Sequence, residues 1–258
     1  MTTETKDGYV KSHTEHAITT IEFFHRQGNS LPGKLLSSLE QEIHYAGTHD
    51  SKVVILKSGG TGAFCAGASF DELIAIQNEQ EGKEFFSGFA NVINAMRKCN
   101  KLIIGRIHGK CVGGGLGLAA AADYTIAVKE AEIKLSELAI GIGPFVVGPA
   151  IERKIGTSAF SQLAIDSTLW RNADWAKKKG LFFEVHESIQ NMDESIDRLA
   201  YALAHSNPEA MSEMKKMFWK GTENWDTVLR EKAAISGKLV LSDFTKNAIA
   251  NFKKKVKR

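Results

Sequence analysis

The chain has 258 residues, of which 43% are hydrophobic, and its 33 basic and 30 acidic residues leave a net charge of +3. This size and composition fit a globular protein with one large domain, or with one domain and a small appendage. The near balance of charge argues against a protein that wraps nucleic acid, and no apolar run reaches the roughly 18 residues that a membrane-spanning helix needs.

The N-terminal segment MTTETKDGYV has neither an apolar core nor an Arg-rich amphipathic pattern. It therefore predicts no secretory or organelle signal, and a cytoplasmic location is expected. The three cysteines, Cys65, Cys99 and Cys111, are odd in number and lack the paired spacing of a zinc or redox site. Neither a disulfide framework nor a metal site is predicted, and a reducing compartment fits this cysteine usage.

The first part of the chain alternates strand-like runs with helical ones. Residues 9–11, 17–24 and 53–56 are rich in β-forming side chains and predict short strands. Between the second and third of these, apolar residues at helical spacing predict a helix that has Pro32 in its first turn and Ser30 as its cap.

Two glycine-rich turns follow buried strands. FCAGAS at residues 64–69 comes after the strand just described, and GKCVGGGLG at residues 109–117 comes after an apolar run at residues 102–107. Helices are expected at residues 71–77 and, with a marked apolar face, at residues 85–99. Each glycine-rich turn can present bare backbone N–H groups to a ligand oxygen.

The rest of the chain changes character near Asp193. Before it, strands are expected at residues 124–128 and 132–135 and a helix from residue 148 onward, so alternating strands and helices place the core in the α/β class. After it, glycine is scarce and long amphipathic helices are expected, at residues 196–204, 208–219 and 227–252, the last with breaks near Gly237 and Ser242. Their aromatic side chains indicate a covered surface, which faces either the chain's own core or another subunit.

Six segments, in order along nearly the whole chain, resemble the crotonase superfamily of enoyl-CoA hydratases and isomerases. They are GNSLPGKLLSSLEQEI, FCAGASFDEL, IIGRIHGKCVGGGLGLAAAAD, SELAIGI, AKKKGLFFEV and NPEAMSEMKKMF. The resemblance implies a spiral of repeated β-β-α turns with an acyl-CoA site at residues 1–192. It also implies a helical subdomain at residues 193–258 that packs against the core and builds homotrimers or dimers of trimers.

The resemblance places an oxyanion hole at the backbone N–H groups of Ala68 and Gly114. The chemistry agrees, because both groups lie in turns after buried strands and Gly114 can begin a helix whose positive end favours negative charge. The coenzyme A moiety belongs to the substrate, so no separate cofactor is implied. The residues that the resemblance implies for substrate binding are Ala66, Gly67, Ser69, Phe70, Gly115 and Ser136, with Arg26 and Lys254 for the phosphate groups.

The acidic residues depart from the hydratase pattern. Hydratases of this superfamily carry one glutamate two residues after the triple glycine and a second in the later turn, but this chain has Gly117 at the first position and Glu137 at the second. Pro144, Phe145 and Val146 stand where dienoyl isomerases carry an aspartate. A lone glutamate can take a proton from the carbon beside a thioester and return it elsewhere. Double-bond isomerisation is therefore the leading hypothesis.

Apolar residues around Glu137, namely Leu135, Leu138, Ile140 and Ile142, are expected to desolvate its carboxyl and raise its pKa, which suits a proton shuttle near neutral pH. Two alternatives stay open. The chain could be a hydratase or run another crotonase reaction, such as decarboxylation or C–C cleavage. It could also be a CoA- or RNA-binding protein without catalysis, because Gly117 replaces an acid and residues 252–258 are basic.

Overall fold

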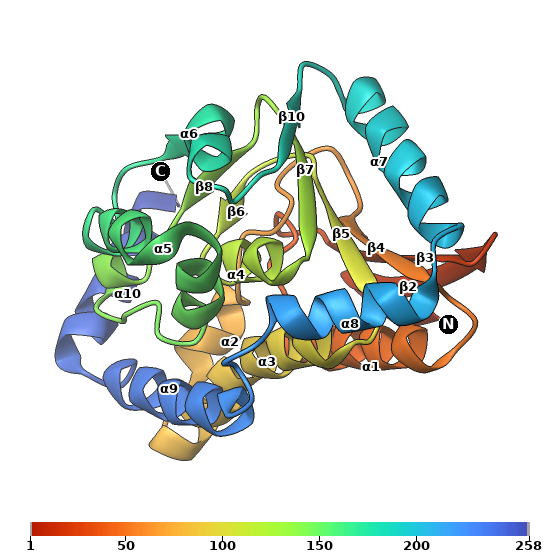
Figure 1. Ribbon diagram of the computed structural model, residues 1–258. Helices are drawn as coiled ribbons and strands as arrows, with labels where there is room; N and C mark the ends of the chain where they lie inside the picture. The colour runs from red at the N-terminus through yellow and green to blue at the C-terminus, as the bar shows by residue number, and fades with distance from the viewer. Residues whose placement is uncertain (1, 257–258) are drawn as a thin grey trace.

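A mixed β-sheet lies at the centre of the computed structural model, and helices surround it (Figure 1). The structure describes residues 2–256, and it describes side chains up to residue 251. The predicted basic run at residues 252–258, Lys254 included, therefore lies outside the described side chains.

The large sheet combines an antiparallel edge with a parallel body. Its strands follow the order β1-β2-β3-β4-β5-β7-β10, in which β1 to β3 pair antiparallel and the pairs from β3 onward are parallel. The parallel strands β4 and β5 each begin with a buried apolar run, VVIL in β4 and LII in β5, as expected for strands covered on both faces. The strands are β1 (Thr2–Thr5), β2 (Gly8–Glu15), β3 (Ile18–His25), β4 (Val53–Ser58), β5 (Leu102–Ile107), β7 (Tyr124–Val128) and β10 (Glu184–His186).

A second, short sheet runs beside the large one. It contains β6 (Cys111–Val112), β8 (Glu132–Lys134) and β9 (Arg171–Asn172). Two successive units of the chain each give one strand to each sheet and then a helix: β5 and β6 precede α4 (Gly114–Ala121), and β7 and β8 precede α5 (Gly148–Ile165). This repeated β-β-α order confirms the α/β class. It also delivers the segment after each short strand to the same end of the molecule.

The remaining helices cover the sheets and one another. Several of them begin at a polar residue whose side chain caps the helix. At the start of α2, for example, the side chain of Ser69 accepts a hydrogen bond from the N–H of Glu72. They are α1 (Gly33–Thr48), α2 (Phe70–Ala75), α3 (Glu79–Lys98), α6 (Ala173–Lys178), α7 (Ile189–Ala204), α8 (Pro208–Phe218), α9 (Trp225–Leu239) and α10 (Asp243–Val256).

Two sequence expectations about helix ends are wrong. Ser30 does not cap α1, which begins at Gly33 after Pro32 without any side-chain cap. Gly237 does not interrupt a helix either, because α9 continues to Leu239. The glycine serves close packing instead, since a Cβ on Gly237 would lie 2.5 Å from the backbone nitrogen of Lys83 in α3.

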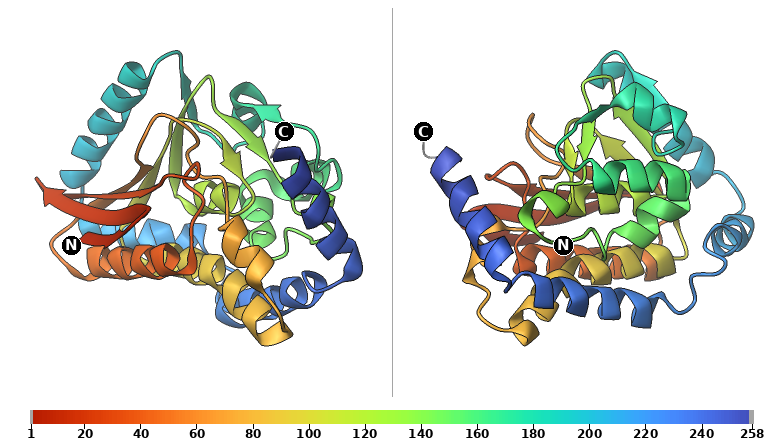
Figure 2. Two further views of the ribbon diagram at one scale, coloured as in Figure 1. Left: turned by 180° about the vertical axis from the view of Figure 1, so that it is seen from behind. Right: turned by 90° about the vertical axis from the view of Figure 1, so that its left-hand side faces the viewer.

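The last two helices, α9 and α10, lie on the side of the molecule where α2 and α3 lie (Figure 2). The indole rings of Trp219 and Trp225 meet edge to face at 5.8 Å and are 5% and 8% exposed, so they belong to the chain's own core. The predicted boundary between residues 192 and 193 falls inside α7, and the division into two units stays a prediction. None of the described helices is both long enough and apolar enough to cross a membrane.

Candidate active site

The two glycine-rich turns predicted from the sequence lie against each other. Gly67, in the first turn, has a φ of +93°, which favours glycine. A Cβ at this position would lie 3.0 Å from the carbonyl oxygen of Val112 and 3.5 Å from the backbone nitrogen of Gly114 in the second turn. The parallel bridge between Cys65 and Cys111 holds the turns together, because the short sheet continues through it.

Two backbone N–H groups are left over where these turns meet. Next to Ala68, the N–H of Ser69 donates to Leu31 at 3.2 Å, and next to Gly114, the N–H of Gly113 donates to Lys134 at 3.0 Å. The N–H groups of Ala68 and Gly114 themselves have no acceptor among the described residues. Gly114 is also the first residue of α4, so its N–H lies at the positive end of a helix.

Glu137 reaches the same place from the end of the short sheet. It follows β8 and precedes a 3₁₀ turn, η1 (Leu138–Ile140), and its carbonyl oxygen accepts hydrogen bonds from Ile140 at 3.2 Å and Ile142 at 3.0 Å. The carboxylate packs on Gly113, where a Cβ would lie 2.8 Å from Oε1. Because Gly113 has a φ of +52°, a side chain there is disfavoured by both its backbone and its neighbour.

The Glu137 carboxyl is poorly solvated. The residue is partly exposed, but Oε2 is buried and has no hydrogen-bond partner among the described residues. Burial raises the pKa of Glu137 from 4.5 to about 7, against the lowering effect of the backbone N–H groups of Glu137 and Ser136. At neutral pH the carboxyl is therefore poised between its acid and base forms.

A cavity of about 160 Å³ joins the two turns and the acid. Of the residues proposed from the sequence, it is lined by Ala66, Gly67, Ala68, Phe70, Gly114, Ser136 and Glu137. Among the described lining residues, Glu137 carries the only ionisable side chain. The cavity thus combines two free backbone donors with one acid of raised pKa.

The apolar wall of the cavity was not predicted. It comes from α3 and from the segment after η1, and Ser236 of α9 closes one side. The amphipathic pattern of α3 signalled buried aromatic residues but not the surface they face, and nothing in the sequence points to Ser236. The additional lining residues include Leu73, Phe85, Phe86, Phe89, Val112, Gly113, Ile140, Ile142 and residues 143–147.

Three of the proposed binding residues, Ser69, Gly115 and Arg26, do not line this cavity. Ser69 is buried as the cap of α2, and Gly115 is packed so closely that a Cβ would lie 2.3 Å from the carbonyl oxygen of Cys65. Arg26 pairs with Asp7 at 3.0 Å on the surface. The side chain of Lys254 lies outside the described residues. Phosphate binding by Arg26 and Lys254 stays a prediction.

Gly117 has no room for a side chain. In the hydratases that the sequence resembles, an acidic residue stands at this position. A Cβ on Gly117 would lie 2.6 Å from Cγ1 and 2.8 Å from Cβ of Val147. Gly117 lies in the buried helix α4, and Val147 lines the cavity from the segment before α5. The space of a second carboxylate is therefore occupied by an aliphatic side chain.

Replacing Gly117 with alanine is expected to lower the free energy of unfolding by about 2 kcal/mol, because the new methyl group overpacks Val147. Urea denaturation measures this loss. If the clash is the cause, adding Val147→Ala makes the double variant more stable, by about 1 kcal/mol, than the sum of the two single changes predicts. Strictly additive losses would contradict this explanation.

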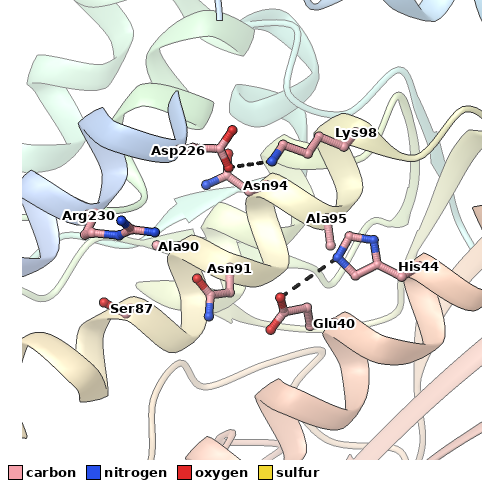
Figure 3. Close-up of a pocket in the computed structure, with 10 residues that line it drawn as sticks. All are labelled: Glu40, His44, Ser87, Ala90, Asn91, Asn94, Ala95, Lys98, Asp226 and Arg230. Carbon is pink, nitrogen blue, oxygen red and sulfur yellow. Dashed lines mark hydrogen bonds and ion pairs between the residues drawn. The ribbon is translucent and has the colours of Figure 1, made fainter. Parts of the chain in front are cut away.

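A polar groove of about 370 Å³ between α1, α3 and α9 is a competing candidate for the site of the chemistry (Figure 3). Its charged side chains are largely satisfied by one another: Lys98 Nζ lies 2.6 Å from Asp226 Oδ1, and His44 Nε2 lies 3.9 Å from Glu40 Oε1. The groove is lined by helix side chains and offers no backbone donors from a turn. It therefore lacks the arrangement found around Glu137.

A metal ion has no evident ligand set in the described part of the chain, since no three His, Cys, Asp or Glu side chains gather there. That the chain works without a metal or a separate cofactor stays a prediction. The buried thiols of Cys65 and Cys111 have raised pKa values because of desolvation, so neither is activated as a thiolate.

Comparison with known proteins agrees with the fold and with the family that the sequence resembles. A model of the enoyl-CoA hydratase/isomerase family matches residues 13–257. The chain is similar to a peroxisomal Delta(3,5)-Delta(2,4)-dienoyl-CoA isomerase of Arabidopsis thaliana, with 25% identity over 205 residues that cover 74% of this chain and 70% of the relative. It is also similar to a mitochondrial methylglutaconyl-CoA hydratase of Mus musculus, with 31% identity over 201 residues that cover 76% and 63%.

A solved structure supports the fold independently. The crystal structure of an enoyl-CoA hydratase from Bacillus halodurans matches with a TM-score of 0.86 and 20% identity, and the match covers 94% of this chain and 99% of that chain. This likeness confirms the spiral fold that the sequence resemblance implied.

Proposed function

Because the chain belongs to the enoyl-CoA hydratase/isomerase family, we propose that it moves the double bond of an enoyl-CoA thioester, with Glu137 as the proton shuttle. The family assignment makes it an isomerase/hydratase-like enzyme that acts on acyl-CoA. The observation that carries the finer proposal is the cavity whose lining includes one acid of raised pKa and two residues with unpaired backbone donors.

In the proposed reaction, the thioester carbonyl of a 3-enoyl-CoA accepts hydrogen bonds from the N–H groups of Ala68 and Gly114. The Glu137 carboxylate removes a proton from C2, and the electrons of the broken C–H bond pass into the dienolate, whose oxygen carries the negative charge. The two donors stabilise that charge more than they stabilise the neutral carbonyl. The protonated Glu137 then delivers the proton to C4, and the product is a 2-enoyl-CoA.

The surroundings of Glu137 suit both halves of this transfer. A general acid and base is most effective when its pKa lies near the working pH, and burial brings the pKa of this carboxyl to about 7. The apolar wall formed by Phe85, Phe86 and Phe89 limits access of water to the enolate. The cavity is small, so the length and branching of the acyl chain that it accepts are to be measured with a series of acyl-CoA substrates.

Hydration is the second candidate, and its support is the 31% identity to a methylglutaconyl-CoA hydratase. Addition of water usually uses two acids in this superfamily, and here the contact of Gly117 with Val147 fills the place of one of them. A binding protein without catalysis is the third candidate. Assembly into trimers or dimers of trimers and a cytoplasmic location remain predictions from the sequence.

Assays of the purified chain with 3-enoyl-CoA and 2-enoyl-CoA thioesters separate the three candidates. We expect double-bond migration, seen as the appearance of the conjugated 2-enoyl-CoA in the ultraviolet, at a rate at least about 100 times that of hydration. If 3-hydroxyacyl-CoA were the main product, the proposed isomerase activity would be wrong and hydration would be the function. Saturable binding of CoA thioesters with neither product would support the binding protein.

A further inference from the structure

A second cavity, of about 480 Å³, lies at the opposite end of α4 from the catalytic one, because Asp123, which follows the helix, lines it and Gly114, which begins the helix, lines the catalytic cavity. It is bordered by β5, by the start of β7 and by α5, α7 and α8, and it opens to the surface where Phe183, Met214 and Phe218 are exposed. Its walls are mostly apolar, and its volume falls in the range of small-molecule sites. The apolar lining residues are Leu102, Ile103, Ile104, Tyr124, Phe183, Leu199, Leu203, Met214 and Phe218.

Two cationic side chains from α5 line the same cavity. Lys154 Nζ donates to the carbonyl oxygens of Ala122 at 2.8 Å and Asp123 at 3.0 Å, at the end of α4. Arg153 donates from Nη1 to the carbonyl oxygen of Phe218 at 2.9 Å, and its guanidinium stacks 3.7 Å from the centre of the Trp219 ring. The Arg153 Nε is buried and has no hydrogen-bond partner among the described residues.

The positive charge of this pair is not neutralised locally. Asp123 is the acid that lines the cavity, but its carboxylate is already held by Lys215 Nζ at 2.9 Å, by Trp219 Nε1 at 3.0 Å and by the N–H of Ile103 at 2.8 Å. Within the described chain, no carboxylate lies within ion-pairing distance of Arg153 or Lys154. The cluster of three cations and one acid therefore carries a net positive charge beside an apolar chamber.

Desolvation disfavours the charged forms of both Arg153 and Lys154. Burial lowers the pKa of Lys154 to about 8, with Asp123 acting in the opposite direction and Arg153 in the same direction. Burial also lowers the pKa of the Arg153 guanidinium. An anion between the two side chains would offset both effects and would accept the unused hydrogen of Arg153 Nε.

We propose that this cavity binds a small amphipathic carboxylate, whose head group pairs with Arg153 and Lys154 and whose aliphatic chain lies along β5 and α7. The planar guanidinium and the neighbouring ammonium suit a carboxylate head. The long apolar wall suits an aliphatic chain rather than a nucleotide or sugar. The site is separate from the catalytic cavity, since the two share no lining residue.

Calorimetric titration of the full chain with decanoate tests this proposal. We expect saturable binding of one decanoate per chain, and binding of the uncharged decanol at least about tenfold weaker. Lys154→Met is expected to weaken decanoate binding at least about tenfold, while Lys154→Arg, which keeps the charge, stays within about threefold. Lys178→Met, on the exposed face of α6, removes the same charge elsewhere and is expected to change nothing.

A second variant tests the chamber without touching its charge. Leu203→Trp fills the cavity, and we expect it to abolish decanoate binding while the unfolding temperature and enoyl-CoA turnover stay near those of the parent chain. Absence of saturable binding, or equal binding by Lys154→Met, would overturn the proposal. So would competition between decanoate and a CoA thioester, which would place decanoate in the catalytic cavity. Self-association that buries α7 and α8, seen by light scattering and hydrogen exchange, would make the chamber an interface between copies and would also overturn it.

Discussion

Glu137→Gln is expected to lower the kcat for double-bond migration by roughly 1,000-fold while the chain still binds enoyl-CoA. The amide has the size of the carboxylate and fits on Gly113, but it has no oxygen basic enough to take a proton from C2. Stopped-flow absorbance of the conjugated product measures the rate, and calorimetry with a non-reactive CoA thioester measures the binding. The binding constant is expected to stay within about fivefold.

Glu132→Gln is the matched control, because Glu132 lies on β8 only a few residues before Glu137 and pairs on the surface with Lys110 at 3.1 Å. We expect this variant to keep the full rate. If Glu137→Gln retained more than about a tenth of the parent rate, the acid would not be the base, since general base catalysis contributes well over that factor.

The pH dependence of the parent chain and of Glu137→Gln tests whether the Glu137 carboxylate is the base. With a pKa of about 7 in the free enzyme, kcat/KM of the parent chain should fall about tenfold for each pH unit below 7 and level off above it, because the carboxylate is the reactive form.

The free energy of unfolding of the parent chain should show the opposite pH dependence and decrease as the pH rises. The stabilising effect of a raised carboxyl pKa is fully present below pH 4.5 and is lost as the pH rises through about 7. Relative to the parent, Glu137→Gln should gain about 2 kcal/mol between pH 5 and pH 8.5.

Much of the site could be predicted because its chemistry lies in short contiguous segments. The FCAGAS and GGG turns, the lone glutamate and its apolar neighbours are each local features of the sequence, and the structure brings Ala68, Gly114 and Glu137 to one cavity. The α/β class followed from the alternation of buried strands with amphipathic helices. The glycines at residues 67 and 113 are also local signals in the sequence. Each has a positive φ, and the missing side chain permits the close approach of a second segment.

What escaped prediction depends on contacts between distant segments. The break expected at Gly237 followed from glycine's low helix propensity, but the contact with Gly82 and Lys83 of α3 decides its role there. Likewise, a sequence pattern gives no information that Ser236 reaches the catalytic cavity or that Val147 fills the space beside Gly117. Such pairings are set by tertiary packing, which a single sequence read by local rules does not encode.

Removing the backbone donor at Ala68 is expected to cost about 100-fold to 1,000-fold in kcat/KM, the usual effect of losing one oxyanion-hole hydrogen bond. Ala68→Pro deletes this N–H, and it breaks no internal hydrogen bond because the group has no acceptor among the described residues. Ala68→Gly keeps the N–H and trims only a methyl group, so it should stay within about threefold of the parent rate.

Because the rigid ring could also disturb the turn, a subtler replacement decides the matter. Exchanging the Ala68 amide for an ester, which puts oxygen in place of N–H and leaves the side chain unchanged, should lower kcat/KM by about the same factor as proline. The infrared carbonyl stretch of a bound thioester gives a second readout, because the free N–H groups of Ala68 and Gly114 should shift it to lower frequency and the ester variant should lose part of that shift. A full rate in the ester variant would mean that the N–H of Ala68 does not stabilise the enolate oxygen. In that event Gly114, as the first residue of α4, would be the main donor, and the helix end rather than the pair of turns would stabilise the charge.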